Sequence, residues 1–391
     1  MPSLRRLTGR DRPATVHVEV PLALLDVLRD GPAPLSGEGP TRAGAERLRV
    51  AVVIPSFRRG SGGHATIANL VRGLEARGHQ LALFLVDQQG RHAGDDAEQL
   101  FESFFGPVAG PVHDGLDAWR GADVVLATGW QTVPDVLALP DAAARAYLVQ
   151  DHEPEFYPTS AERLWAEWTY RQGLHCVCAS PWLADVVTDR YGASATAFDL
   201  GVDHAAYRAL PTHRREDLVL FYARAVTPRR AVPLGVLALA ELHRRRPTVE
   251  LAVFGEAGAV KLPFPARQLG VMAPEALAHA YASATVGLCL SLTNPSLIPT
   301  EMMACGLPVV DVASDAMVAT FGVSGGGRGP VLAEPDPLAL CDAIEGLLDD
   351  LLVRATRSRE GAELVAERTW PNAAEQVERG LRAALGAATC D

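Results

Sequence analysis

The sequence predicts an α/β protein made of two successive halves. Two observations support this fold class. From residue 49 onward, short runs rich in valine, leucine and alanine alternate with helical stretches, which is the pattern of a parallel sheet covered by helices. A polar link at 208–217, RALPTHRRED, interrupts this pattern before it restarts. We therefore expect two α/β domains facing a central cleft, because ligands bind outside the carboxyl ends of parallel strands.

The expected strands follow from the apolar runs. In the first half they cover 49–55, 81–87, 122–128, 145–151 and 174–180, and in the second half 218–224, 249–255, 286–290 and 307–313. Between the first two strands, Ile67, Leu70, Val71 and Leu74 recur at helical spacing, and Gly78 can end the helix. This stretch is one βαβ unit.

Residues 1–47 fit neither half, and we assign them no role. They hold a strand-like run at 15–20, TVHVEV, a helix-like run at 21–31, and a link rich in proline and glycine. The extension lacks the apolar segment of a secretory signal. The longest apolar runs, 81–86 and 286–290, are far shorter than the roughly 18 residues that cross a bilayer. We expect a cytoplasmic protein without a transmembrane segment.

Composition narrows the classes of partner. The chain has 47 acidic and 36 basic residues and a net charge of −11, which argues against nonspecific binding of nucleic acid. The six cysteines are scattered, with no CxxC pair, so buried free thiols are expected rather than a zinc or redox site. No residues at metal-ligand spacing flank His152, and we predict no metal and no cofactor.

In the second half, Arg224 ends a strand and Arg229 and Arg230 follow it. Guanidinium groups at this edge suit a diphosphate, because charge-assisted hydrogen bonds to phosphate are worth about 1.5–3 kcal/mol each. For Arg230 we favour a solvated turn. Glu301 follows Pro299, so we place it in the first turn of a helix, where the dipole alone favours a carboxylate by roughly 0.3–1 kcal/mol. Capping and ribose binding by Glu301 both stay open.

In the first half, a strand ends in Gln150, Asp151, His152 and Glu153. Such a density of titratable groups suggests a general base or an acceptor-positioning site, although a polar rim is the alternative. The loop at 55–65, PSFRRGSGGHA, opens the first helix, where backbone N–H groups can face an anion.

The same loop matches a dinucleotide fingerprint, G-x-G-x-x-A, at Gly60, Gly62 and Ala65, with Asp87 after the next strand. An NAD(P)-type oxidoreductase is therefore a rival function. Five residues, from Pro55 to Arg59, separate strand and glycines, whereas the fingerprint begins almost at the strand end. This spacing favours a longer loop that reaches over a cleft.

Taken together, the motifs resemble GT-B glycosyltransferases of the large retaining family 4, over 48–385. The segments that carry the resemblance are GGH at 62–64, SPWLADVVTDRYG at 180–192, LGVDHAAYR at 200–208, Arg224 with Arg229, VFGEAG at 253–258, LGVMAPEALAHAYASATVGLCLS at 269–291, EMMACGLPVV at 301–310 and ERTWPNAAEQ at 367–376. More narrowly, YLVQDHEPEFYP at 147–158 and NPSLIPTEM at 294–302 look like the rhamnosyltransferases that build bacterial surface rhamnans.

The resemblance implies two Rossmann-like domains with separate tasks. An acceptor-binding domain at 48–208 and a nucleotide-sugar-binding domain at 209–367 would follow the extension at 1–47, and a helix at 368–391 would cross back to the first domain. The enzyme would be retaining and metal-independent. Asp151, His152, Arg224 and Glu301 would be catalytic. The donor would be bound by Gly62, Gly63, Arg224, Arg229, Gly255, Gly270, Val271, Thr293, Asn294, Ser296, Leu297, Thr300 and Glu301.

Three positions depart from the family pattern. Thr293 stands where members carry a glutamate eight positions before the second one, Leu200 replaces an asparagine, and Gln150 replaces an acceptor-side histidine. These departures imply either another donor sugar, such as a 6-deoxyhexose (L-rhamnose) on dTDP, or a weakened enzyme. A non-catalytic GT-B partner protein is thus the first alternative. The acceptor, a glycan, a lipid-linked glycan or a small molecule, stays open, as do peripheral membrane contact and a homodimer.

Overall fold

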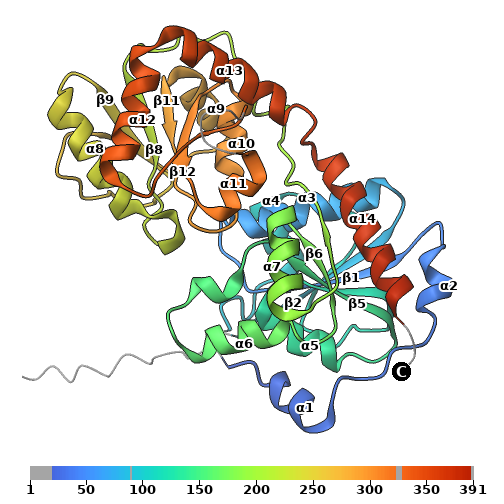
Figure 1. Ribbon diagram of the computed structural model, residues 1–391. Coiled ribbons are helices and arrows are strands. Elements are labelled where there is room, and N and C mark those ends of the chain that lie inside the picture. Colours follow the sequence, from blue (N-terminus) through green and yellow to red (C-terminus); the bar gives the residue numbers. More distant parts are fainter. Residues whose placement is uncertain (1–19, 89, 323–327, 389–391) are drawn as a thin grey trace, which may run out of the picture.

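The computed structural model describes residues 20–88, 90–322 and 328–388, and shows two α/β halves joined by paired crossing segments (Figure 1). The strand-like run expected at 15–20 lies outside the described residues except for Val20. Each half contains a parallel sheet, with strand order β3-β2-β1-β4-β5-β6-β7 in the first and β10-β9-β8-β11-β12-β13 in the second. Both orders are doubly wound, which agrees with the two Rossmann-like domains that the resemblance implies.

The strands of the first sheet are β1 (Arg49–Pro55), β2 (Gln80–Val86), β3 (Val112–Asp114), β4 (Ala122–Ala127), β5 (Ala142–Val149), β6 (His175–Cys178) and β7 (Ala195–Ala197). Those of the second are β8 (Leu218–Tyr222), β9 (Glu250–Phe254), β10 (Arg267–Gly270), β11 (Val286–Leu288), β12 (Val309–Val312) and β13 (Val331–Ala333). All nine strands expected from the sequence are present. The four strands that the sequence analysis missed, β3, β7, β10 and β13, are the edges of the two sheets.

Helices cover both faces of each sheet. In the first half they are α1 (Ala23–Asp30), α2 (Gly39–Ala43), α3 (Gly62–Ala76), α4 (Ala97–Phe105), α5 (Val133–Ala138), α6 (Ala161–Thr169) and α7 (Pro181–Tyr191), with 3-10 helices η1 (Trp130–Thr132) and η2 (Glu153–Phe156). In the second they are η3 (Pro228–Arg230), α8 (Val232–Arg245), α9 (Pro274–Ser283), α10 (Leu297–Ala304), α11 (Asp315–Phe321), α12 (Pro337–Asp349) and α13 (Leu351–Val365). The predicted helix face of Ile67, Leu70, Val71 and Leu74 is buried in α3.

Residues 20–48, the described part of the chain before β1, wrap the first half rather than forming a unit of their own. The helix expected at 21–31 is present as α1, which packs on α5 through Leu24 and Val27. The chain then follows the sheet, where Arg145 donates to the Ala33 carbonyl at 2.6 Å. Arg42 pairs with buried Asp123 at 2.6 Å.

The last helix, α14 (Trp370–Ala387), crosses back from the second half and lies along the first (Figure 1). Its apolar side, including Val377 and Leu381, is part of the hydrophobic core of the first half. Arg77, the C-cap of α3, pairs with Glu378 of α14 at 2.5 Å. This is the returning helix that the resemblance predicts.

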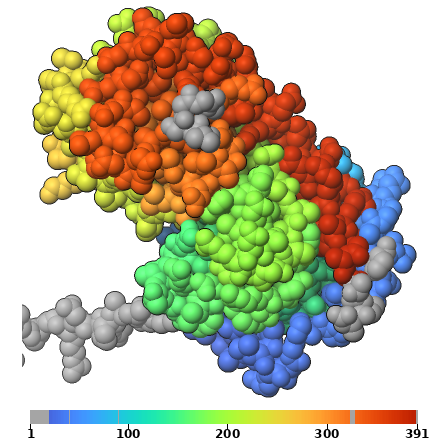
Figure 2. Space-filling model, in the orientation of Figure 1, coloured from blue at the N-terminus to red at the C-terminus, as the bar shows by residue number. Residues whose placement is uncertain are grey.

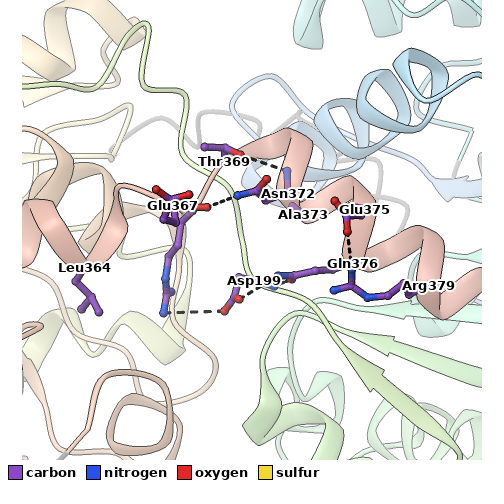
Figure 3. Close-up of a pocket in the computed structure, with 10 residues that line it drawn as sticks. Asp199, Leu364, Glu367, Thr369, Asn372, Ala373, Glu375, Gln376 and Arg379 are labelled. Atoms are coloured by element: carbon purple, nitrogen blue, oxygen red, sulfur yellow. Dashed lines mark hydrogen bonds and ion pairs between the residues drawn. The ribbon is translucent and has the colours of Figure 1, made fainter.

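The two crossing segments run side by side between the halves. The Val202 amide donates to the Arg368 carbonyl at 2.8 Å, and Val202 forms a β-bridge with Thr369. A Cβ on Gly201 would lie 2.6 Å from the Trp370 nitrogen, so only glycine allows this approach. A cavity of about 360 Å³ lies beside them, and its lining includes Asp199, Arg368 and Gln376; Figure 3 shows Asp199 and Gln376 among the side chains that line it. We call these segments and this cavity the hinge.

Candidate functional site

The carboxyl ends of the two sheets face each other and are joined by direct contacts. Asp151, just after β5, is buried and accepts hydrogen bonds from the second half: the Thr293 hydroxyl lies 3.0 Å from Oδ2 and the Asn294 amide 3.1 Å from Oδ1. The His152 backbone amide also donates to Oδ1, at 2.9 Å. A predicted catalytic residue thus binds two predicted donor-binding residues.

Asn294 inserts between two strand ends of the first half. Its side-chain amide donates to the carbonyls of Gln150 and Ala179, at 3.1 and 3.2 Å. Its Oδ1 accepts from the hydroxyl of Ser180, the N-cap of α7, at 2.7 Å. The side chain is 1% exposed, so every polar group of this amide has a protein partner.

Arg229 of η3 completes the contact. Its Nε forms an ion pair with Asp151 Oδ2 at 2.9 Å, and its guanidinium carbon lies 4.0 Å from the centre of the Phe156 ring. Burial lowers the pKa of Arg229, and the charge of Asp151 opposes this change. Asp151, Thr293, Asn294 and Arg229 are called the latch below.

The loop that carries Thr293 and Asn294 is also held by hydrogen bonds within the second half. Asp311 of β12 accepts from the Ser291 amide at 2.7 Å and from its hydroxyl at 3.0 Å, and the Leu292 amide donates to the Arg229 carbonyl at 3.2 Å. Burial raises the pKa of Asp311 to about 7, and these bonds and Arg230 oppose the rise.

Arg230 is not the solvated residue that we expected. It is 6% exposed, and Nη1 lies 3.4 Å from the Ser291 hydroxyl. The physical reason is Asp311: a buried acid in an otherwise apolar strand attracts a buried guanidinium. Ala231, which follows, adopts a left-handed conformation with φ 42°.

Glu301 lies in the second turn of its helix, not in the first as expected. The helix α10 begins at Leu297, so Pro299 is its third residue, where a missing N–H costs nothing because the first amides have no partner in the helix. The dipole explanation for Glu301 is therefore weakened. Burial raises the pKa of this carboxyl to about 8; the Tyr281 hydroxyl opposes the rise and Asp203 adds to it.

Of the other predicted donor-binding residues, Arg224, Gly255, Gly270 and Val271 lie around the ends of β8, β9 and β10, and Ser296, Leu297 and Thr300 lie at the start of α10. Arg224 Nη1 lies 3.4 Å from the Gly255 carbonyl, and the Gly255 amide donates to Gly270 at 2.9 Å. Burial raises the pKa of Tyr222. The charges of Arg230 and Arg224 oppose this rise, and that of Glu301 adds to it. Val271 is exposed, Ser296 is the N-cap of α10 with Leu297 next to it, and Thr300 donates to the Leu297 carbonyl at 2.7 Å.

His152 is bound into the first half. Its Nε2 lies 2.8 Å from the Tyr191 hydroxyl and its Nδ1 3.0 Å from a Glu155 carboxylate oxygen, and the ring is buried. Glu153 is buried beside it and accepts from the Trp130 amide at 2.7 Å. Burial raises the pKa of Glu153 to about 7.

The glycine loop lies next to this cluster. A Cβ on Gly63 would lie 3.6 Å from the Gln150 side chain, whereas one on Gly62 would meet open space. His64 braces the loop: its Nδ1 is 2.9 Å from the Ser61 hydroxyl and its Nε2 3.1 Å from the Pro55 carbonyl. Asp87, the ribose ligand of the dinucleotide hypothesis, accepts from the His92 amide at 2.7 Å within its own loop.

Ser180, Phe156 and Asp311 also belong to the site, and no pattern in the sequence indicated them. Ser180 and Phe156 occur in segments that we quoted for the resemblance, but neither residue type indicates a contact across two domains. Within the described ranges, no group of three or more His, Cys, Asp or Glu side chains is placed to hold a metal ion. No described helix combines the length and the apolar character needed to span a membrane.

The sequence is similar to one protein family and to two characterised proteins. Residues 217–319 match the family described as the C-terminal domain of WsaF. The chain is 32% identical over 267 residues to the O-antigen biosynthesis protein RfbC of Myxococcus xanthus, covering 66% of this chain and 20% of that protein. It is 28% identical over 209 residues to a phosphatidyl-myo-inositol mannosyltransferase of Mycolicibacterium smegmatis, covering 50% of this chain and 54% of that protein.

Solved structures resemble both halves together. Sucrose-phosphate synthase of Thermosynechococcus elongatus superposes with a TM-score of 0.64 at 16% identity, over 85% of this chain and 97% of that one. HepE of Anabaena, crystallised with UDP and glucose, gives 0.65 at 15% identity, over 86% and 100%. With two parallel-sheet halves, facing carboxyl edges and a returning last helix, the chain has the GT-B fold of glycosyltransferases.

Proposed function

We propose that this protein is a glycosyltransferase that takes a sugar from a nucleotide donor. One observation carries the proposal: Arg224, Arg229 and Glu301 lie at the carboxyl edge of the second sheet, and Arg229 and its neighbours contact the facing edge of the first. Arginines there suit a diphosphate, and a buried carboxylate suits vicinal hydroxyls. The 209–367 half would bind the donor and the 48–208 half the acceptor.

For the donor, we propose a 6-deoxyhexose such as L-rhamnose on dTDP, with retention and without a metal ion. The resemblance of 147–158 and 294–302 to rhamnosyltransferases supports this choice. HepE was crystallised with UDP, so UDP-sugars are the first competitors. The similarity to an O-antigen biosynthesis protein and to a phosphatidyl-myo-inositol mannosyltransferase supports a glycan or a lipid-linked acceptor.

A donor screen tests this function. We expect one nucleotide among UDP, dTDP and GDP, or its sugar, to raise the melting temperature, because a ligand that binds only the folded state stabilises it. Product release with candidate acceptors, read by mass spectrometry, then identifies the transferred sugar. Arg224→Ala and Glu301→Ala should remove both signals, whereas Arg244→Ala, on the exposed face of α8, should leave them. Absence of any response to all nucleotides contradicts the proposal.

A nucleotide-sugar-binding protein without transferase activity is the second candidate. The observation that favours it is that Asp151 and His152 are both bound to protein groups. Nucleotide binding without product, for every acceptor and donor supplied, would select this candidate.

A further inference from the structure

The carboxylate of Asp151 has both oxygens committed to protein groups. Oδ1 accepts two backbone amides, those of His152 and Asn294, and Oδ2 accepts the Thr293 hydroxyl and pairs with Arg229. A carboxylate has about four acceptor positions. Three hydrogen bonds and one ion pair to protein groups thus surround the Asp151 carboxylate, so its geometry is that of a support.

The residues that Asp151 supports belong to the second half and are connected to one another by hydrogen bonds. Arg229 and the loop that carries Thr293 are tied together by the bond from the Leu292 amide to the Arg229 carbonyl. Below them, Ser291 is held by Asp311, and Ser314 donates to the Ser291 carbonyl at 2.8 Å. The loop is thus rigid in its own half and presents its tip to Asp151.

The contact also sets the direction of the Arg229 guanidinium. Within the described part of the chain, Arg229 uses its Nε on Asp151 and its flat face on Phe156. The ion pair is made by Nε and not by Nη1 or Nη2, which are the groups that bind phosphate in a two-pronged manner. An ion pair through Nε thus orients the arginine and leaves its phosphate-binding end available.

Asn294 makes this arrangement depend on the relative position of the two halves. Its amide is satisfied only when it reaches the Gln150 and Ala179 carbonyls and the Ser180 hydroxyl. In any other relative position of the halves, these polar groups would need water or would remain unpaired, which is costly for buried groups.

We propose that Asp151 is a positioning residue that seats Arg229 and the 293–294 loop across the interface, so that both halves together assemble the site for the donor diphosphate. This inference rests on the proposed function and assigns to Asp151 a task other than that of a general base. Phe156 contributes to the same positioning, because its ring packs against the flat face of the Arg229 guanidinium.

The test compares Asp151→Asn with Asp123→Asn in the full chain. Asp123 is equally buried and ion-paired, with Arg42 and Arg49, but all its partners lie in the first half. For each variant, the Kd of UDP, dTDP and GDP is measured by calorimetry, and KM and kcat are measured for consumption of the donor sugar. We expect Asp151→Asn to raise Kd and KM by about 10- to 100-fold, the value of one or two misplaced charge-assisted hydrogen bonds, with kcat within about threefold.

A double variant shows whether Asp151 acts through Arg229. If Asp151 acts through Arg229, adding Asp151→Asn to Arg229→Gln should lower nucleotide affinity little further, because the effects of substitutions at contacting residues are not additive. If Asp151→Asn does not fold, Phe156→Leu serves as the second variant, with an expected rise in Kd and KM of about threefold at unchanged kcat. Asp123→Asn should lower the melting temperature and leave nucleotide affinity unchanged.

The outcomes separate this inference from the proposed function. If the wild type binds a nucleotide and Asp151→Asn binds it equally well but loses kcat, Asp151 acts on the reacting group and the positioning role is overturned. Unchanged Kd, KM and kcat in both Asp151→Asn and Phe156→Leu would overturn it as well. If the wild type binds no nucleotide, the proposed function fails, and this inference fails with it.

Discussion

The two halves of the molecule meet in two regions that differ in packing. At the latch, Asp151, Thr293 and Asn294 are at most 6% exposed and their polar atoms are paired across the interface. At the hinge, Asp199, Arg368 and Gln376 are only partly buried around a cavity of about 360 Å³ (Figure 3). The Arg368–Asp199 ion pair spans 4.0 Å, whereas that of Arg229 with Asp151 spans 2.9 Å.

The difference shows where relative motion is easiest. In the space-filling view the two halves touch near α7 and α11, which lie against each other (Figure 2). Separating the halves at the latch would remove partners from buried polar groups, whereas a small rotation at the hinge would change partly exposed contacts. We infer that the latch fixes the relative position of the two halves at the strand ends, and that small changes of this position take place at the hinge.

Thr293→Glu should give the largest effect, because it places a second carboxylate beside Asp151. An uncompensated buried charge costs about 3–5 kcal/mol of folding free energy. Urea unfolding measures the loss, with Thr293→Ser as the control because it keeps the hydroxyl. A variant as stable as the wild type, with an altered choice of donor sugar, would mean instead that residue 293 faces the ligand.

Asn294→Ala and Gln376→Ala compare the two regions directly. Each removes a side-chain amide that bridges parts of the chain. Among the described residues, half-buried Gln376 binds Asp199 alone: its Oε1 accepts from the Asp199 backbone amide at 2.5 Å, and its Nε2 donates to the Asp199 carboxylate at 3.3 Å. We expect a loss of about 2–3 kcal/mol for Asn294→Ala and less than about 1 kcal/mol for Gln376→Ala. Equal losses in chemical denaturation would remove the distinction between latch and hinge.

Glu301 should make stability and donor binding respond oppositely to pH. Its pKa of about 8 exceeds the ordinary 4.5, so the folded chain binds more protons than the unfolded chain between these values. Stability therefore falls as pH rises through this window, and Glu301→Gln should gain on the order of 1–3 kcal/mol over the wild type at pH 8.

Donor binding should strengthen over the same pH range, because ribose hydroxyls donate best to an ionised carboxylate. Calorimetry at pH 6 and pH 8.5 measures this change, and Glu301→Gln should abolish it. A nucleotide affinity that is flat with pH in the wild type would contradict the role of Glu301 at the ribose.

Ala231→Gly should give the smallest effect and tests the strain next to the latch. Ala231 has φ 42° and ψ 39°, a left-handed conformation that costs an alanine about 1–2 kcal/mol, whereas glycine loses about 0.5–1 kcal/mol in chain entropy. We expect a net gain of up to about 1 kcal/mol in thermal unfolding. Destabilisation would show that the methyl group, which is 7% exposed, contributes packing that outweighs the strain.

The sequence predicted the interior of the fold better than its borders. Central strands such as β1 and β4 are buried on both faces and appear as continuous apolar runs. The edge strands span three or four residues, and β10, RQLG, is mostly polar, so no periodicity could reveal them. The helix α10 began two residues before the proline that we used to mark its start.

In the candidate site, the sequence indicated which residues gather but not which of them bind one another. Gln150, Asp151, Thr293 and Arg229 were each found from strand ends or family motifs. Their contacts join positions more than 70 residues apart in the chain, which residue spacing cannot predict. Arg230 was misread because its partner, Asp311, is hidden in a run that otherwise reads as a buried strand.

The returning helix α14 has a consequence for the order of folding during synthesis. The apolar cores of the second half come from one continuous stretch, from Val202 to Val365, whereas the core of the first half includes Val377 and Leu381 of α14. The half that the ribosome makes first is thus completed last. Until α14 docks, its place on the first sheet stays uncovered, and a nascent chain arrested before Trp370 should be a client of chaperones.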